Sequence, residues 1–341
     1  MRLPPPYQRQ TTTSLRRRRT RMAGIFLLLG AFAALLIAWQ ALGGGKDAGS
    51  QASLAPLDPC LIQDCPAPEE PSLQRAEPCP YCDQDPGRWQ SLTSVQPPEI
   101  LGTAATVLEG SCGRLIYGLE EGRRLAPASL TKIVTALVVM DEAELEDRVP
   151  IDLDGWRLVV EDESSIMGLE AGMNLSVEEL LFGLLLPSGN DAALALAEHL
   201  GGMDRFVALM NEAVQSRGLA DSRFANPDGR DASGSYTSAL DIVLLGHDLM
   251  QEPDLRRIAG TQTFLPDWEG HLLWNANYLV YGYEGATGVK IGFTEAAKET
   301  IVGSAERDGR EIFVSVLGSD FAYVDAVKLL DWAFDNTQPA C

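Results

Sequence analysis

The segment from Ser129 to Met140 places the strongest constraint on what this chain can fold into. It has the length of an ordinary helix, and apolar side chains occupy nearly all of its faces. A helix without a polar face must be buried. We therefore expect this segment to lie inside a folded domain whose other elements cover it.

Segments with strand character lie on both sides of a long helical region. The expected strands are residues 104–107, 114–117, 288–293, 299–305 and 311–317, and the further expected helices are residues 176–186, 192–200, 203–215, 237–250 and 323–334. The helices at 203–215 and 237–250 are expected to be amphipathic. Turns at 109–113 and 306–310, the second with Asp-Gly at its centre, predict hairpins. This order predicts an α/β protein of the α+β type, with an antiparallel sheet flanked by helices and an all-helical subdomain. It does not favour a parallel doubly wound sheet.

The N-terminal region predicts export of the body. Residues 1–21 contain seven arginines and no acidic side chain, and residues 22–42 contain no charged side chain. Such an uncharged run is long enough to cross a bilayer as a helix, and basic flanks stay in the cytoplasm. We expect a basic cytoplasmic tail at 1–21 and a single transmembrane helix at 22–42. A cleaved signal peptide, with Ala41 and Gly43 near its cleavage site, is the alternative.

Residues 43–97 are expected to form an extracytoplasmic linker, because they are rich in proline and poor in aliphatic side chains. Four of the six cysteines lie there: Cys60, Cys65, Cys79 and Cys82. Outside the cytoplasm we expect disulfides, whose pairing the sequence leaves open. A zinc site and a thiol redox site at the C-x-x-C spacing are the alternatives. Cys112 and Cys341 are too far apart in sequence to predict a bond.

The charge is strongly acidic and unevenly distributed. The whole chain has 27 cationic and 48 acidic side chains, a net charge of -21. Because the first 45 residues hold seven of the cations and none of the acids, the remainder carries -28. Such a body repels nucleic acid and anionic lipid surfaces at long range. We therefore exclude nucleic-acid binding.

Lysine is rare in this chain, with five lysines against 22 arginines. A position that has Lys is a candidate for a side chain that must lose its proton, which Arg cannot do. Lys132 follows Ser129 by three residues, which places both side chains on one helix face. Burial lowers the pKa of a lysine, and a neutral lysine can take the proton of a serine nucleophile. By itself the S-x-x-K spacing is weak, because a serine helix cap followed by a surface cation gives the same pattern.

Two further motifs follow in the chain. Ser188 and Asn190 form an S-x-N sequence between two apolar helices, and alone they indicate only an interhelical turn. Lys290 and Gly292 form a K-x-G sequence in a β-prone run, where a glycine often marks the close approach of a ligand. The order S-x-x-K, S-x-N, K-x-G is the signature set of penicillin-binding serine enzymes.

The residues around these motifs are similar to those of a known enzyme family. The sequences Pro-Ala-Ser-Leu-Thr-Lys at 127–132, Leu-Leu-Pro-Ser-Gly-Asn-Asp at 185–191, Asn-Pro-Asp-Gly at 226–229 and Gly-Val-Lys-Ile-Gly-Phe-Thr at 288–294 are similar to those of the D-alanyl-D-alanine carboxypeptidase family, peptidase family S11. The likeness extends from about Ile100 to Phe334. It implies a β-lactamase/transpeptidase-like fold in a serine D,D-peptidase domain, which we expect at 98–336, followed by a short tail at 337–341.

The resemblance implies a role for each motif residue. Ser129 would be the acylated nucleophile and Lys132 its general base. Ser188 would relay protons, and Asn190 would hold the peptide group of the substrate. Lys290 would attract the terminal carboxylate beside Gly292, and the N–H groups of Ser129 and Phe293 would form the oxyanion hole.

The resemblance also implies the partners of the chain. The substrate would be a peptidoglycan stem peptide ending in D-Ala-D-Ala, and β-lactams would acylate the same serine. No metal or cofactor is implied. The body would lie outside a bacterial cell membrane, which the N-terminal helix would cross once.

Two departures from the family bear on activity. The family usually has Thr where this chain has Ile291, so a hydroxyl that could bond the substrate carboxylate is missing, and Thr287 or Thr294 is a candidate to replace it. Lys298 stands where the family tends to have Gly. A D,D-endopeptidase on the same scaffold is one alternative, and a weakly active or non-catalytic wall-binding homologue is the other. The histidines His199, His247 and His271 match no triad spacing, and the first two are expected to be structural.

Overall fold

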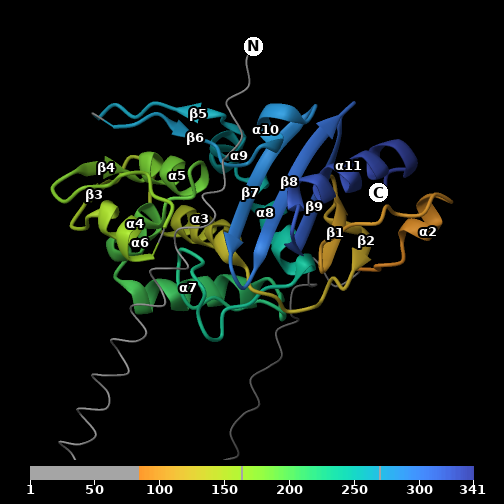
Figure 1. The fold of residues 1–341 in the computed structure, drawn as a ribbon, viewed down its shortest axis with the longest axis horizontal. Coiled ribbons are helices and arrows are strands. Elements are labelled where there is room, and N and C mark those ends of the chain that lie inside the picture. Colours follow the sequence, from red (N-terminus) through yellow and green to blue (C-terminus); the bar gives the residue numbers. More distant parts are fainter. Residues whose placement is uncertain (1–83, 163, 269) are drawn as a thin grey trace, which may run out of the picture. The chain divides into compact units, whose positions relative to one another are not determined.

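A five-stranded antiparallel sheet organises the computed structural model, which describes residues 84–341 except 163 and 269 (Figure 1). The strand order is β2-β1-β9-β8-β7. The strands are β1 (Ala104–Glu109), β2 (Arg114–Leu119), β7 (Ala286–Thr294), β8 (Lys298–Arg307) and β9 (Arg310–Ser319). Strand β1 pairs with β9, so the two ends of the domain meet in the centre of the sheet. The expected antiparallel sheet is confirmed, and it leaves β7 at one edge.

Both expected hairpins are present. At the tip of the β8–β9 hairpin, Asp308 and Gly309 have φ values of 52° and 78°. A two-residue hairpin turn of this kind needs positive φ at both central residues, which an Asp-Gly pair supplies at low cost. The β1–β2 hairpin turns between Glu109 and Arg114, which pair with each other.

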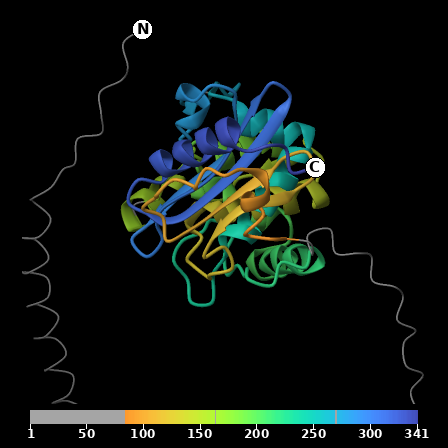
Figure 2. The ribbon, with the colours of Figure 1, turned by 90° about the vertical axis from the view of Figure 1, so that its right-hand side faces the viewer.

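Helices cover both faces of the sheet. Helix α11 (Ala322–Asn336) lies across one face, as Figure 2 shows, and its Leu329, Leu330 and Trp332 join the apolar cluster beneath it. Helix α8 (Ala239–Gln251) covers the other face. We expected α8 to be amphipathic, and this was wrong. It is buried on nearly every side, because it lies between the sheet and the helical region.

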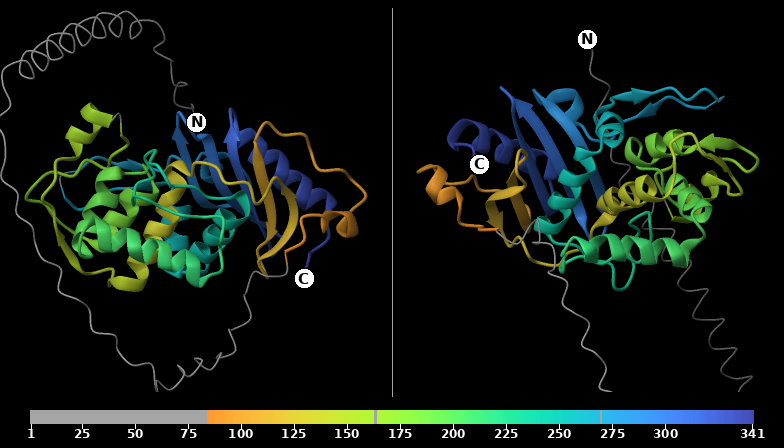
Figure 3. Two further views of the ribbon diagram at one scale, coloured as in Figure 1. Left: turned by 90° about the horizontal axis from the view of Figure 1, so that it is seen from below. Right: turned by 180° about the vertical axis from the view of Figure 1, so that it is seen from behind.

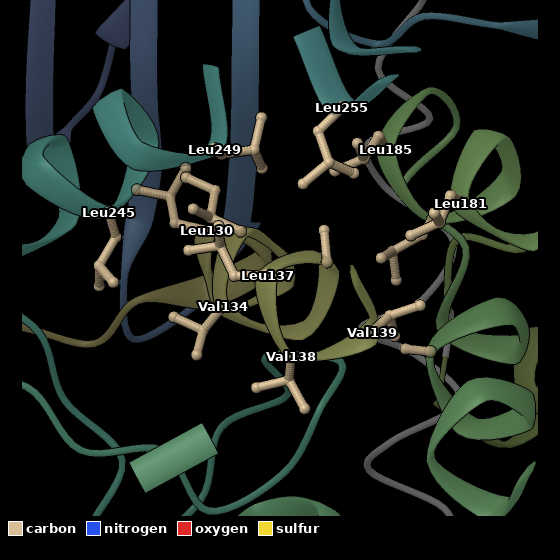
Figure 4. Packing of buried hydrophobic residues seen from close by; sticks show 14 of the residues in the cluster. Leu130, Val134, Leu137, Val138, Val139, Leu181, Leu185, Leu245, Leu249 and Leu255 are labelled. Atoms are coloured by element: carbon tan, nitrogen blue, oxygen red, sulfur yellow. The ribbon is translucent and has the colours of Figure 1, made fainter. Parts of the chain in front are cut away.

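The buried helix predicted from its apolar faces is α3 (Thr131–Glu142), which follows a short 3-10 helix, η1 (Ala128–Leu130). All residues from Thr131 to Val139 are buried. Figure 4 shows α3 between the leucines of α8 on one side and those of helix α5 (Val177–Leu185) on the other. Because it is wedged between the sheet layer and the helical subdomain, α3 holds its first turn at the junction of the two.

The helical subdomain lies on the α8 side of the sheet (Figure 3). Besides α5 it contains α6 (Asn190–His199) and α7 (Met203–Ser216), which the sequence predicts, and α4 (Gly155–Asp162) and α9 (Pro253–Gly260), which it does not. Three small features were also missed: the strand pair β3 (Arg148–Pro150) and β4 (Asn174–Ser176), the pair β5 (Thr263–Phe264) and β6 (Leu273–Trp274), and α10 (Leu279–Gly282). Elements of two to four residues are too short for apolar periodicity to reveal.

The folded unit begins before residue 98, where we had placed the end of the linker. The side chain of Gln84 donates to Gly113 O (3.0 Å) and accepts from Leu115 N (2.6 Å). The short helix α2 (Trp89–Leu92) also contacts the domain, since Trp89 packs edge-on against Trp332. Residues 84–97 therefore belong to the domain.

The C-terminal residues are likewise part of the domain and not a separate tail. Cys341 forms a disulfide with Cys112, in the turn between β1 and β2, with their Cα atoms 6.5 Å apart. Next to it, Ala340 N donates to Glu109 Oε2 (3.0 Å), and the same oxygen accepts from Arg310 Nη2 (2.8 Å). The sequence alone does not predict this pairing, because the two cysteines are 229 positions apart.

The expected membrane segment at 22–42 and the four linker cysteines lie outside the described residues. Within the part of the chain that the structure describes, no helix is long and apolar enough to cross a membrane.

Candidate active site

Ser129 and Lys132 meet at the start of the central helix. Ser129 lies in η1, and Lys132 is in the first turn of α3, so their side chains share a face. Lys132 Nζ lies 3.0 Å from Ser129 Oγ. The same ammonium donates to Asn190 Oδ1 (2.7 Å) and to the carbonyl oxygen of Asp228 (2.5 Å). The three acceptors fix the nitrogen directly beside the serine hydroxyl.

The environment of Lys132 makes it an accessible base. Its side chain is completely buried, and this burial lowers its pKa from the usual 10.5 to about 8. The buried carboxylates of Asp228 and Asp191 oppose the shift, whereas the guanidinium of Arg230 adds to it. A fully exposed lysine would be almost entirely protonated near neutral pH. The buried one loses its proton two to three orders of magnitude more readily on the same scale.

Ser188 and Asn190 approach from the connection between α5 and α6. Ser188 has φ +65°, a left-handed conformation that is uncommon for a residue with a side chain. Its Oγ is buried and has no hydrogen-bond partner among the described residues. Asn190 begins α6 and joins Lys132 to Ser164, whose Oγ accepts from its Nδ2 (2.8 Å). A strained backbone at a functional site is a recurring device for aiming a side chain.

Lys290 lies on edge strand β7 and is almost completely buried. Its Nζ donates to Ile291 O (3.0 Å). Burial, and then the charge of Lys132, lower the pKa of Lys290. The charge of Lys132 thus disfavours the charged form of Lys290.

Two glycines allow the backbones around Ser129 to meet. A Cβ on Gly292 would lie 2.7 Å from Ser129 N, and a Cβ on Gly229 would lie 2.0 Å from the carbonyl oxygen of Ala128. Neither distance is possible for a real side chain. Gly292 therefore lets β7 come up to the N–H of Ser129, and Phe293 follows at the edge of the strand. An oxyanion hole requires two N–H groups at one position, and both Ser129 and Phe293 line the same cleft.

All of these elements open onto one cleft of about 690 Å³. Its lining includes Ser129, Ser188, Asn190, Gly292 and Phe293, together with Ser164, Ser165, Asp228, Arg230, Asp231, Ile291, Thr294 and Glu295. The structure thus brings every motif residue expected from the sequence to the cleft or, for Lys132 and Lys290, directly beneath it.

Ile291 lies at the cleft and also packs against the apolar cluster under α11. Of the two threonines considered as replacements for the missing hydroxyl, Thr287 is bonded to Ser304 Oγ (2.6 Å) and Glu311 Oε1 (2.9 Å) and does not line the cleft. Thr294 does line it, but its hydroxyl donates to Asp231 Oδ1 (2.8 Å). Among the two, only Thr294 has the right position.

The sequence does not predict the contacts of three further residues at the site. Asp228 sits within the quoted Asn-Pro-Asp-Gly motif, but nothing in the sequence tied its carbonyl to Lys132. Arg230 pairs with the carboxylate of Asp228, Nε to Oδ2, at 2.8 Å. Asp191 is fully buried and accepts from the backbone N–H groups of residues 167–169, which hold the segment carrying Ser164 at the cleft. A carboxylate next to the S-x-N motif was the available signal for the last of these.

His247 and His271 do not line the cleft. His247 lies on α8, where its Nε2 is 2.8 Å from Gly110 O and its ring packs edge-on against Phe313. His271 lies in the β5–β6 connection against Trp156. Within the described range, no group of three or more His, Cys, Asp or Glu side chains is arranged to hold a metal ion.

Comparison with known proteins identifies the family. A family model described as D-alanyl-D-alanine carboxypeptidase, peptidase family S11, matches residues 91–320. The chain belongs to this family. It is 33% identical to D-alanyl-D-alanine carboxypeptidase DacF of Bacillus subtilis over 68% of its length, and it spans 62% of that relative. It is 32% identical to DacB2 of Mycobacterium tuberculosis, over 72% of this chain and 86% of the other.

Solved structures agree with this assignment. The Streptomyces K15 DD-transpeptidase superposes with a TM-score of 0.67 at 29% identity, covering 70% of this chain and 99% of that one. Penicillin binding protein 6B from Escherichia coli gives a TM-score of 0.67 at 32% identity, covering 71% and 80%. The expected β-lactamase/transpeptidase-like fold is confirmed.

Proposed function

We propose that the protein is a serine-type D-Ala-D-Ala carboxypeptidase that trims peptidoglycan stem peptides through an acyl-enzyme on Ser129. The observation that carries this proposal is the 3.0 Å approach of a completely buried lysine nitrogen to the Ser129 hydroxyl. Burial lowers the pKa of Lys132, so that its neutral form can act as a base. The short distance between the two side chains lets Lys132 take the proton of Ser129.

In the first step Lys132 Nζ, in its neutral form, accepts the proton of Ser129 Oγ while that oxygen attacks the carbonyl carbon between the two D-alanines. The N–H groups of Ser129 and Phe293 stabilise the oxyanion. Ser188 relays the proton from Lys132 to the leaving nitrogen, the C–N bond breaks, and the last D-alanine departs. Water then attacks the ester, and the serine regains its proton.

Asn190, Lys290 and the strand backbone at Gly292 bind the substrate in this scheme. Asn190 orients the peptide group next to the reacting carbonyl. Lys290 attracts the terminal carboxylate. Its positive charge also disfavours a second buried positive charge on Lys132, which therefore stays neutral. β-Lactams present a strained amide to the same serine and leave a stable ester.

We also propose that the domain acts outside a bacterial cell membrane and that the uncharged segment 22–42 anchors it there. The arginines of residues 1–21 and the absence of charge from 22–42 support this placement.

The test is acylation of the full-length protein by a fluorescent penicillin, with the adduct located by peptide mass. A stoichiometric adduct on Ser129 is expected, and Ser129→Ala abolishes it. Ser216→Ala, which removes an exposed hydroxyl at the end of α7, serves as the matched control and leaves labelling intact. If wild-type protein shows no adduct at high penicillin concentration, the acyl-enzyme proposal fails.

A further inference from the structure

A second, smaller pocket lies next to the cleft and is walled by aromatic side chains. It has a volume of about 200 Å³ and is lined by Trp156, Ile166, Met167, Gly168, Pro187, His271, Leu272, Leu273 and Trp274. We call these residues the aromatic pocket. Trp156 comes from α4, and Trp274 belongs to β6, in the projecting β5–β6 pair that Figure 1 shows above α5. None of the catalytic steps above uses these side chains.

The indoles of the aromatic pocket are exposed to an unusual degree. Trp156 is 47% exposed and Trp274 is 60% exposed, and Leu272, which lines the same pocket, is 40% exposed. The ring of His271 meets Trp156 edge-on, with centroids 6.2 Å apart and an angle of 85°. Large apolar side chains gathered around one hollow mark a binding surface more often than single scattered ones do. Flat indole faces give such a surface a shape suited to flat ligands.

The aromatic pocket adjoins the catalytic cleft. Pro187 lines both. In the segment 164–168, the first two residues line the cleft and the next three line the aromatic pocket. In the segment 272–276, residues 272–274 line the aromatic pocket and Ala276 lines the cleft. The carboxylate of Asp191 fixes this common wall by accepting from three successive N–H groups, at 2.9 Å each. A ligand that leaves the cleft along this wall meets the indoles next.

Charge decides which ligand fits. The chain after its first 45 residues carries a net charge of -28, which repels an anionic lipid surface or a polyanion. An uncharged pyranose ring avoids this repulsion and presents C–H groups that stack on an indole. The imidazole of His271 can donate or accept a hydrogen bond at the rim. An N-acetylated amino sugar combines a ring of this kind with an acetamido group that has both a methyl group and hydrogen-bonding atoms.

We infer that the aromatic pocket binds the N-acetylated sugar from which the stem peptide extends, so that the protein recognises the glycan and the peptide terminus together. This inference rests on the proposed function for its substrate, because the sugar and the D-Ala-D-Ala end belong to one molecule. It adds a second binding site for a neutral saccharide beside the serine cleft.

The kinetic test compares two substrates with the same pentapeptide, one free and one attached to a disaccharide of N-acetylglucosamine and N-acetylmuramic acid. The wild-type protein should hydrolyse the glycosylated peptide with a kcat/KM about tenfold higher, mainly through KM. Trp156→Ala and Trp274→Ala should abolish this preference, while turnover of the free peptide and acylation by penicillin stay unchanged. Tyr323→Ala, an exposed aromatic on α11, is the control and should keep the preference.

A binding test separates this inference from the proposed function. Saturation-transfer NMR on an oligomer of N-acetylglucosamine, which lacks any peptide, should show transfer to the acetamido methyl and ring protons with wild-type protein and with Ser129→Ala, and none with Trp274→Ala. If penicillin acylates Ser129 but the oligomer gives no indole-dependent signal and the glycosylated peptide is not preferred, the aromatic pocket is not a saccharide site. If the oligomer binds but Ser129 is never acylated, the pocket stands and the enzyme proposal falls. Indole-dependent binding to anionic lipid vesicles without a saccharide signal would also overturn the inference.

Discussion

Arg230 and Asp228 form an ion pair directly beside Lys132. Arg230 Nε lies 2.8 Å from Asp228 Oδ2, and the carbonyl oxygen of the same aspartate accepts from Lys132 Nζ at 2.5 Å. The carboxylate is completely buried, so its charge is felt strongly by the lysine. Asp228 raises the pKa of Lys132, and Arg230 lowers it. Asp228 has the larger effect of the two, so the pair as a whole favours the ammonium, and burial outweighs it to lower the pKa of Lys132.

Replacing Arg230 should shift the pH dependence of acylation. In Arg230→Gln the charge of Asp228 is no longer compensated, so the pKa of Lys132 rises above its value of about 8 and the neutral base becomes scarcer at a given pH. The rising limb of kcat/KM against pH should therefore move to higher pH, and activity near pH 7 should fall several-fold. Asp228→Asn removes the charge that favours the ammonium and should move the limb to lower pH.

The control for this prediction is Arg217→Gln. Arg217 also pairs through Nε with an aspartate at 2.8 Å, Asp248, but does not line the cleft. Its removal should leave the profile in place. A fall in activity of Arg230→Gln by the same factor at every pH would show that the arginine only supports the loop and does not tune the base.

Ile291→Thr should raise the rate of acylation. The substitution restores a hydroxyl at the cleft lining, where a hydrogen bond to a substrate carboxylate is worth about 1.5–3 kcal/mol. The expected gain is on the order of tenfold in kcat/KM for peptides with a free terminal carboxylate. Because Ile291 also packs on the cluster under α11, the same change should cost roughly 1 kcal/mol of unfolding free energy.

Ile301→Thr separates these two effects. Ile301 pairs with Ile291 across β7 and β8 and is buried away from the cleft, so the same substitution there should lower stability without raising activity. Peptide hydrolysis and urea unfolding of both variants provide the comparison. An unchanged rate in Ile291→Thr would mean that Thr294 already serves the carboxylate.

Asp191→Asn should loosen the wall shared by the cleft and the aromatic pocket. The carboxylate accepts hydrogen bonds from four backbone N–H groups, those of residues 167–169 and of Ala192. An amide offers only one oxygen and turns a donor toward the others. We expect a loss of roughly 2–4 kcal/mol in unfolding free energy, and a rise in KM larger than the fall in kcat. Asp204→Asn, which changes an exposed aspartate in the first turn of α7, should do neither. Unaltered hydrogen exchange at the amides of residues 167–169 would argue against the prediction.

Cys112→Ser should destabilise the domain while leaving the cleft intact. Loss of a native disulfide typically costs about 2–5 kcal/mol. We expect a lower urea midpoint for the variant, and an equal lowering when wild-type protein is reduced. Ser111→Ala, beside it in the same exposed turn, should keep the wild-type midpoint. A midpoint that does not respond to reductant would show that the bond contributes little to the folded state.

The positions of the motif residues could be predicted because short spacings along the chain determine which of their side chains lie together. Ser129 and Lys132 are one helical turn apart, and Asn190 starts a helix whose apolar neighbours are plain in the sequence. The sheet was predictable for a similar reason, since Asp308 and Gly309 specify one turn type. In each case a local pattern of a few residues determines the relevant contact.

The same reasoning cannot predict contacts between segments that are far apart in the sequence. Asp228 meets Lys132 only through the tertiary fold, and its carboxylate is useful there only because Arg230 follows two residues later. The strands of the β5–β6 pair have two residues each, too few to show alternation, and so the grouping of Trp274 with Trp156 could not be foreseen. The burial of α8 depends on its being covered from both sides, which no single helix pattern encodes.

The bond between Cys112 and Cys341 has a consequence for resistance to proteolysis. Every motif residue, from Ser129 to Phe293, lies between the two cysteines. A protease that nicks an exposed loop anywhere in this span, such as the turn at Asp308, therefore cannot release either fragment. The two pieces remain one covalent molecule, held in register by the sheet, and a single cut need not inactivate the enzyme.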